Sequence, residues 1–397
     1  MRNLLLLLLC ALPFAASAQP LTEAATLRLG LARPEFAELQ RAHVEAAEAD
    51  VLAAGAWTNP TLEFARDRLG GERETSWQLA QPFDLSGRRG LRADAARHRV
   101  RASAADNLGR RDERAATLRR AFHDTLHLQE AQGAVAAWAR RFAVIDGVVA
   151  KLARAGEVAG YDRRRLAREQ RSAEAKLAET RAELERSRAR LAGLIGKDVG
   201  GDLAGPLLPD APPPLPELQG KLAARPEFAA LAARAEAAQA DNAAARRNLP
   251  ELTLGVGGKR VEDGPLRENG NMVMLSFTLP LFDRQQAADR RSAAQMLAAR
   301  AELGLARQQA EGELLGLHRQ ATQLAAAAAR YRSEAVAPSA ELLRIAESAY
   351  KAGESGVLEL LDAYKGALEA ELTALDLEAK ARTARIELDQ LTGNHPQ

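Results

Sequence analysis

The amino-acid sequence contains an internal duplication, which limits the possible folds more than any other feature. Residues 33–37 (Arg-Pro-Glu-Phe-Ala) return as residues 225–229, and Arg-Ala-Gly-Glu at 154–157 has the counterpart Lys-Ala-Gly-Glu at 351–354. The two halves also end alike, in Leu-Ile-Gly and Leu-Thr-Gly, and a proline-rich stretch that disfavours helix separates them. We therefore predict two structural repeats, residues 19–205 and 218–397, joined by a linker at residues 206–217.

Each half has the same expected order of elements: a helix, two strands, a very long helix and a further helix. The strands are indicated by side chains that alternate in character, as where Val273, Leu275 and Phe277 face one side and Ser276 and Thr278 face the other. We expect strands at about residues 61–68, 74–83, 252–260 and 272–281. We expect the first helix at about residues 22–56 and its counterpart at about 218–248.

The long helices are indicated by apolar residues that recur every three or four positions, such as Val135, Trp138 and Phe142, a spacing typical of coiled-coil packing. Only 4% of the residues are aromatic, which is too little ring volume for an ordinary large globular core. The predicted fold class is therefore mainly α with a small β part. We expect long helices at about residues 87–154 and 284–352, final helices at about 161–196 and 357–392, and a local bend at Pro338.

The N-terminus has the pattern of a cleaved signal peptide. A charged start, an apolar run from Leu4 to Leu12 and the small residues at 16–18 predict export and cleavage after residue 18. A membrane anchor is the alternative, but the run is too short to cross a bilayer. The sole cysteine, Cys10, lies in this segment, so the mature chain would have no disulfide and no thiolate ligand. A net charge of +2 gives no reason to expect nucleic-acid binding.

Export and strand length together suggest an outer-membrane protein. No segment after the signal peptide has 18 uninterrupted apolar residues, so a crossing would have to use strands. Four strands cannot close a barrel, for which about eight are needed, and copies of the chain would have to pool their strands. Two copies would supply eight strands and three would supply twelve, so closure predicts a symmetric oligomer without fixing its size. Edge hairpins of a soluble domain are the alternative.

Together with these features, the sequences at residues 350–353 (Tyr-Lys-Ala-Gly) and 357–363 (Val-Leu-Glu-Leu-Leu-Asp-Ala) resemble the outer membrane efflux protein family, whose best-known member is TolC. Residues 58–62 (Thr-Asn-Pro-Thr-Leu) and 81–89 (Gln-Pro-Phe-Asp-Leu-Ser-Gly-Arg-Arg) resemble its CzcC-type branch, the outer components of heavy-metal efflux systems. The resemblance covers nearly the whole mature chain. It implies a homotrimer with a twelve-stranded barrel in the outer membrane and an α-helical tunnel in the periplasm.

The resemblance also implies a function. The chain would be a passive exit duct, not an enzyme, for substrates that an inner-membrane pump of the RND class delivers through a periplasmic adaptor (membrane fusion protein). Divalent heavy-metal cations are the expected cargo, and no cofactor or catalytic residue is expected. Drugs or polypeptides exported by type I secretion are alternatives, because the pump selects the cargo. A periplasmic coiled-coil adaptor or structural protein is the alternative from another class, although an adaptor would have one helical hairpin rather than two matched halves.

In this family the periplasmic entrance lies at the tips, where each long helix turns into the next. The resemblance places the tips at residues 154–165 and 351–362, with adaptor contacts at their glycines, and it aligns two acidic residues with the family's acidic rings. The first tip carries arginines instead, and we hypothesise that these pair with the acidic residues and keep the entrance closed. A solvated charge run is the alternative. The candidate gate residues are Asp162, Arg163, Arg164, Arg165, Glu359 and Asp362, and the tip glycines are Gly156, Gly160, Gly353 and Gly356.

His123 and His127 have the four-residue spacing that can place two imidazoles on one metal ion. A third ligand is not evident, and the mature chain would have no cysteine. We therefore predict no metal site and interpret both histidines as surface or lumen-facing residues.

Overall fold

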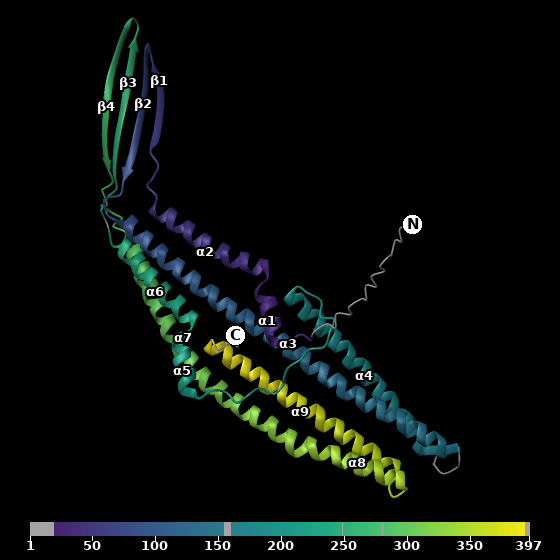
Figure 1. Ribbon diagram of the computed structural model, residues 1–397. Coiled ribbons are helices and arrows are strands. Elements are labelled where there is room, and N and C mark those ends of the chain that lie inside the picture. Colours follow the sequence, from purple (N-terminus) through teal and green to yellow (C-terminus); the bar gives the residue numbers. More distant parts are fainter. Residues whose placement is uncertain (1–19, 155–159, 248, 280, 394–397) are drawn as a thin grey trace, which may run out of the picture.

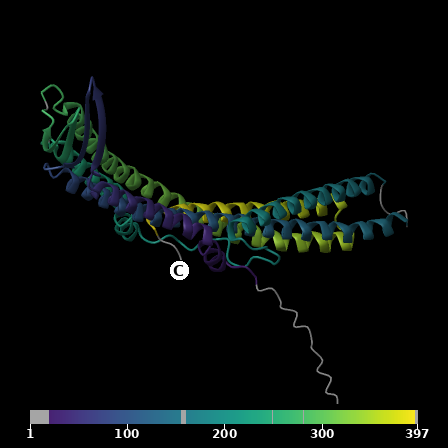
Figure 2. The ribbon, with the colours of Figure 1, turned by 90° about the horizontal axis from the view of Figure 1, so that it is seen from above.

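The computed structural model describes residues 20–154, 160–247, 249–279 and 281–393. The chain forms a long rod with a β-sheet at one end and two helical tips at the other (Figure 1). A view turned by 90° shows the same elongated shape (Figure 2). The predicted signal peptide and Gly156 lie outside the described residues.

Both halves contain helices, a hairpin, long helices and a final helix, so the prediction of a mainly α chain with a small β part is confirmed. The first half comprises α1 (Glu23–Leu31), α2 (Pro34–Gly55), β1 (Thr61–Leu69), β2 (Glu72–Phe83), α3 (Arg88–Arg154) and α4 (Gly160–Ile195). The second comprises α5 (Leu215–Ala223), α6 (Pro226–Ala245), β3 (Leu252–Asp263), β4 (Leu266–Phe277), α7 (Gln286–Tyr331), the π-helix η1 (Arg332–Val336), α8 (Ala337–Ala352) and α9 (Val357–Thr392).

The expectation of one unbroken helix at the start of each half is wrong. Pro34 and Pro226 each begin a new helix, because proline has no N–H to donate and disfavours helical geometry in the residue before it. The preceding Arg33 is extended, with φ −59° and ψ 126°, and reaches the carbonyl of Gly193 near the end of α4 (3.4 Å). The repeated Arg-Pro-Glu-Phe-Ala sequence therefore marks a helix break.

Two other expected boundaries differ. The linker predicted to end at residue 217 ends earlier, because α5 begins at Leu215, with proline in its first turn where no donor is needed. The last strand spans Leu266–Phe277 rather than about 272–281. Its first half is polar and gave no apolar alternation, and the two-residue turn at Gly264, with φ +55°, brings it directly against β3.

The four strands form one antiparallel sheet in the order β1-β2-β3-β4. Its register pairs Phe64 with Trp77, and Leu79 with Val256. Gly257 is required at the centre, because a Cβ there would lie 2.3 Å from the backbone oxygen of Trp77. Each outer strand, β1 and β4, has a partner on one side only within the described chain.

The helices pack around α3 and α9, which run side by side along the rod (Figure 1). Small and aliphatic residues form their seams, so the helices approach closely. Among the most buried are Phe122, Phe142, Leu166, Leu314, Ala328 and Leu388. None of the helices in the described segments is long and apolar enough to cross a membrane.

Candidate functional site

One face of the sheet is apolar and exposed along its whole width. Residues paired directly across an antiparallel sheet share a face, so the register assigns every side chain to one face or the other. The exposed apolar face carries Leu62, Phe64, Trp77, Leu79, Leu254, Val256, Val273, Leu275 and Phe277. Apolar surface this continuous indicates contact with lipid or another apolar partner. We call it the apolar face, and the opposite one the polar face.

The second tip is shaped by its glycines. Gly353 ends α8 in the left-handed conformation, with φ +74°, and Gly356 precedes α9. The carboxylate of Glu359 accepts a hydrogen bond from the Gly356 N–H, so this predicted gate residue caps its own helix. At the first tip, Gly160 is the first residue of α4, and Gly156 lies outside the described residues.

The two tips lie close together. Burial raises the pKa of the Tyr350 hydroxyl at the end of α8, and the negative charge of Asp162 at the start of α4 raises it further. Lys365 of α9 forms an ion pair with Glu169 of α4 (Nζ to Oε2, 2.7 Å), which the sequence analysis did not identify. The first tip therefore faces the second within one chain.

The predicted gate charges do not pair within one chain. Among the described residues, no ion pair joins Arg163, Arg164 or Arg165 to either predicted acidic partner. Arg163, Arg164, Glu359 and Asp362 are exposed, whereas Arg165 and Asp162 are half-buried. Pairing between neighbouring copies stays a prediction.

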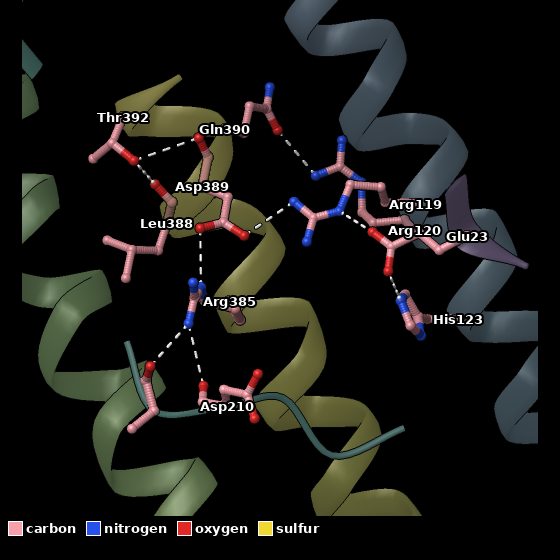
Figure 3. A network of polar contacts seen from close by, with 11 residues as sticks. Glu23, Arg119, Arg120, His123, Asp210, Arg385, Leu388, Asp389, Gln390 and Thr392 are labelled. Atoms are coloured by element: carbon pink, nitrogen blue, oxygen red, sulfur yellow. Dashed lines mark hydrogen bonds and ion pairs between the residues drawn. The ribbon is translucent and has the colours of Figure 1, made fainter. Parts of the chain in front are cut away.

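A buried ionic network lies at mid-length of the rod, and the sequence analysis missed it (Figure 3). Arg119 of α3 donates through Nε to Glu23 of α1 (2.5 Å) and through a terminal nitrogen to Asp389 of α9 (3.0 Å). Arg385 donates to the second oxygen of Asp389 (2.9 Å). Arg119 and Asp389 are each only 3% exposed, whereas Glu23 is 22% exposed, so the network joins three helices around a buried ion pair.

His123 belongs to this network and is buried, so its interpretation as a surface or lumen-facing residue is wrong. Its Nε2 lies 2.9 Å from Glu23, but burial lowers the pKa of the imidazole, so the ring is neutral at pH 7 and donates from Nε2. Burial opposes ionisation of Glu23, yet hydrogen bonds and charges from His123 and Arg119 outweigh it and lower its pKa to about 2. His127 does not join this contact. The described residues contain no cluster of three or more side chains that could hold a metal ion.

The linker between the halves is fastened to α9 by two arginines. Arg382 donates to the carbonyls of Pro206, Leu207 and Leu208 at 2.6–3.0 Å. Arg385 donates to those of Asp210 and Ala211, at 3.2 and 3.1 Å (Figure 3). Arg385 thus couples the linker to the buried network. Local sequence offered no signal for this, because the partners are carbonyls about 175 residues away.

Comparison with known proteins identifies proteins that are similar to this chain. Residues 218–394 match the family model described as outer membrane efflux protein. The chain is 28% identical over 390 residues to the cobalt-zinc-cadmium resistance protein CzcC of Cupriavidus metallidurans, covering 95% of this chain and 91% of that protein. The second structural repeat therefore resembles the outer membrane efflux protein family. A second relative is the nickel-cobalt-cadmium resistance protein NccC of Alcaligenes xylosoxydans, 28% identical over 72% of this chain and 66% of NccC.

Solved structures share the fold of this chain. The outer membrane protein VceC of Vibrio cholerae matches with a TM-score of 0.75 at 17% identity, over 94% of this chain and 96% of VceC. The open-state MtrE outer membrane channel of Neisseria gonorrhoeae matches with a TM-score of 0.74 at 20% identity, over 94% and 88%. The resemblance to the CzcC branch is confirmed by the relatives. The fold is therefore that of these outer-membrane proteins.

Proposed function

We propose that three copies of this chain form the exit duct of a tripartite efflux system. A periplasmic adaptor would join the tips to an inner-membrane pump of the RND class, and the cargo would be divalent heavy-metal cations. The sheet carries the proposal: it has two open edges and an exposed apolar face. If β1 of one copy pairs with β4 of the next, twelve strands close into a barrel whose apolar face meets lipid and whose polar face lines the lumen.

The polar face supports a cationic cargo. It holds a single basic residue, Lys259, which pairs with Glu74 (2.6 Å). Its acidic residues are Glu63, Asp67, Glu72, Glu74, Asp263 and Glu268. Rings of carboxylates favour cations in a pore. CzcC is a cobalt-zinc-cadmium resistance protein and NccC is a nickel-cobalt-cadmium resistance protein. A divalent metal cargo agrees with the negative charge of the polar face.

Disulfide trapping tests the closed ring. The mature chain would have no cysteine, so Ala65→Cys on β1 can be combined with Met272→Cys or Met274→Cys on β4, all on the polar face. Oxidised membranes should yield a covalent species of three chains on a denaturing gel for at least one pair. Ala65→Cys alone is the matched control and should give no trimer. Failure of every pair to link, or a ladder continuing beyond three, would refute the trimer.

The cargo is tested in cells that carry the cognate pump and adaptor. Deleting this protein should lower tolerance to cobalt, zinc and cadmium ions, while tolerance to a hydrophobic drug should stay unchanged. The reverse pattern would favour a drug exit duct. Export by cleavage after residue 18 belongs to the same proposal, and N-terminal sequencing of the outer-membrane form checks it.

We further propose that tip charges of neighbouring copies pair to narrow the entrance. The exposed Asp362 on α9 and the half-buried Arg165 on α4 are available, because neither forms an ion pair in the described part of one chain. Arg165→Ala and Asp362→Ala should each raise single-channel conductance. Arg171→Ala is the control, since Arg171 is 82% exposed and pairs within its own helix with Glu174. If both tip variants conduct like the wild type, these residues do not close the entrance.

A further inference from the structure

The charges of the sheet are sorted between its two faces. Arg66 lies two residues beyond Phe64 on the apolar face, and the strand register places Arg260 in the same cross-strand row. The next row toward the hairpin turns contains the remaining arginines of this face. The arginines of this face are Arg66, Arg68, Arg73, Arg260 and Arg267. Its single acid, Glu262, lies between Arg73 (3.7 Å) and Arg267 (3.6 Å). We call these residues the arginine rows.

The polar face has the opposite charge, with six acids and one lysine. Both faces of the sheet are exposed near the hairpin ends, so exposure alone does not explain why basic and acidic side chains lie on opposite faces. A charge run that served only solubility would mix both signs on each face. The arrangement therefore indicates that arginines are needed on the side that also carries the apolar residues.

Aromatic residues bracket the apolar band below the arginine rows. Phe83 and Phe277 lie in one cross-strand row at the end nearest the helices, and Phe64 and Trp77 lie in another row toward the hairpin turns. Aromatic side chains concentrate at the two interfaces of membrane barrels. The arginine rows begin one row farther out, about 7 Å along the strands, on the side away from the helices (Figure 1). If the two aromatic rows mark the membrane interfaces, the arginine rows lie at the level of the lipid head groups.

We propose that the arginine rows bind the phosphate groups of lipids at the outer surface of the membrane. This rests on the proposed function, in which the apolar face contacts lipid. A guanidinium group binds phosphate with two parallel hydrogen bonds. Arg66 and Arg68 are exposed and form no ion pair within the described residues, whereas Arg260 is oriented by a hydrogen bond from Nε to Asn269 (2.9 Å). Repeated in every copy, the rows form a basic belt around the barrel.

Trp77 is a built-in reporter for this belt. It lies on the apolar face next to the arginine rows, is 48% exposed, and stands over Gly258, where a Cβ would lie 2.8 Å from its indole nitrogen. In a Trp57→Phe/Trp138→Phe background it is the only tryptophan. After reconstitution into phosphatidylcholine vesicles, quenching by brominated phosphatidic acid can be compared with quenching by brominated phosphatidylcholine.

Phosphatidic acid should quench Trp77 at a mole fraction lower by a factor on the order of five or more, from the usual attraction of surface arginines to anionic lipid. The triple variant Arg66→Gln/Arg68→Gln/Arg260→Gln should remove this preference while keeping quenching by phosphatidylcholine. Lys259→Gln is the matched control, because it removes a basic side chain from the polar face of the same strand, and it should keep the preference.

Three results would overturn the proposal. The first is equal quenching by both lipids in the background protein, and the second is an equal loss of preference in Lys259→Gln and in the triple variant. The third is loss of the preference when inorganic phosphate at the concentration of the lipid phosphate is added, which would mean that the rows bind free phosphate. If neither lipid quenches Trp77, the apolar face does not contact lipid, and the proposed function itself fails.

Discussion

The two long helical stretches occupy equivalent positions in the two structural repeats, but only one of them is a continuous α-helix. The α3 helix runs for 67 residues without a break, whereas the corresponding stretch is divided into α7, the π-helix η1 and α8. Pro338 accounts for the division: it cannot donate to the carbonyl of Glu334, and its ring would clash there in a regular helix. The wider π-turn accommodates both effects.

In each stretch one arginine forms an ion pair with α9, and the two ion-paired arginines differ in burial. Arg119 of α3 is 3% exposed, as is its partner Asp389. Arg332 of η1 is 35% exposed and pairs with Glu371 (2.5 Å) and Glu378 (2.8 Å). The unbroken helix is therefore held to α9 by a buried ion pair. The interrupted helix is held by ion pairs that water partly solvates.

The largest expected effect comes from breaking the buried tie. Asp389→Asn keeps the side-chain size but removes the charge that faces both Arg119 and Arg385. Loss of one partner of a buried ion pair typically costs about 3–5 kcal/mol, so thermal unfolding should shift strongly downward. Asp376→Asn is the control, because Asp376 lies on the same helix in an exposed pair with Lys380 and should change stability by less than about 1 kcal/mol. Equal shifts would show that the buried network does not hold α3.

Low pH should weaken the buried network that holds α3, because His123 and Glu23 belong to this network and titrate. Burial lowers the pKa of His123, so as the pH falls below the ordinary value of 6.5 the unfolded chain gains a proton that the folded chain resists, and stability falls. The pKa of Glu23 is lowered to about 2, so its contribution is present above 4.5 and is lost as the pH falls toward 2.

Unfolding measured at pH 7 and pH 5 separates the histidine step. His123→Gln still offers an N–H to Glu23 but cannot titrate, so the loss of stability between these pH values should be smaller than in the wild type. If His123→Gln loses as much stability as the wild type, the acid sensitivity arises elsewhere.

Much of the difference between the two long helical stretches could be predicted from the sequence, because it depends on residues that are close together in the chain. Alternating side chains placed the strands, and apolar spacing placed the long helices. Pro338 indicated an interruption, but whether the helix bends or widens depends on packing against α9, where Arg332 finds its two carboxylates. The proline in each repeated Arg-Pro-Glu-Phe-Ala sequence carried a similar signal, which the prediction of one unbroken helix did not take into account.

The ionic network could not be predicted, because its causes are distant in sequence. Arg119 and Asp389 are 270 residues apart, and nothing local distinguishes Arg119 from its neighbour Arg120, which donates to Gln390 (3.1 Å). At the tips, the candidate gate residues lie near the starts of α4 and α9, and their role stays a prediction. Only the structure shows that Glu359 is engaged by the Gly356 N–H.

Removing the exposed tie should have a smaller effect than removing the buried one. Arg332→Gln leaves Glu378, which is 8% exposed, without its charged partner, but solvent reaches the site and should limit the loss to about 1–2 kcal/mol. Amide hydrogen exchange at residues 330–338 should accelerate. Arg330→Gln, at an exposed position just before the π-helix, should change neither quantity. A loss as large as that of Asp389→Asn would erase the distinction between the two ties.

The smallest expected effect comes from restoring the missing donor. Pro338→Ala supplies an N–H in the first turn of α8, so amide exchange at residues 332–338 should slow as η1 gains a hydrogen bond, while overall stability changes by less than about 1 kcal/mol. Ser339→Ala is the comparison variant: it removes the hydroxyl that donates to the Ala335 carbonyl (2.7 Å) and supplies no new backbone donor, so exchange there should not slow. If exchange in Pro338→Ala is unchanged, the π-turn is maintained by the contacts of Arg332 rather than by the proline, and the difference between the two long stretches lies in their ties to α9.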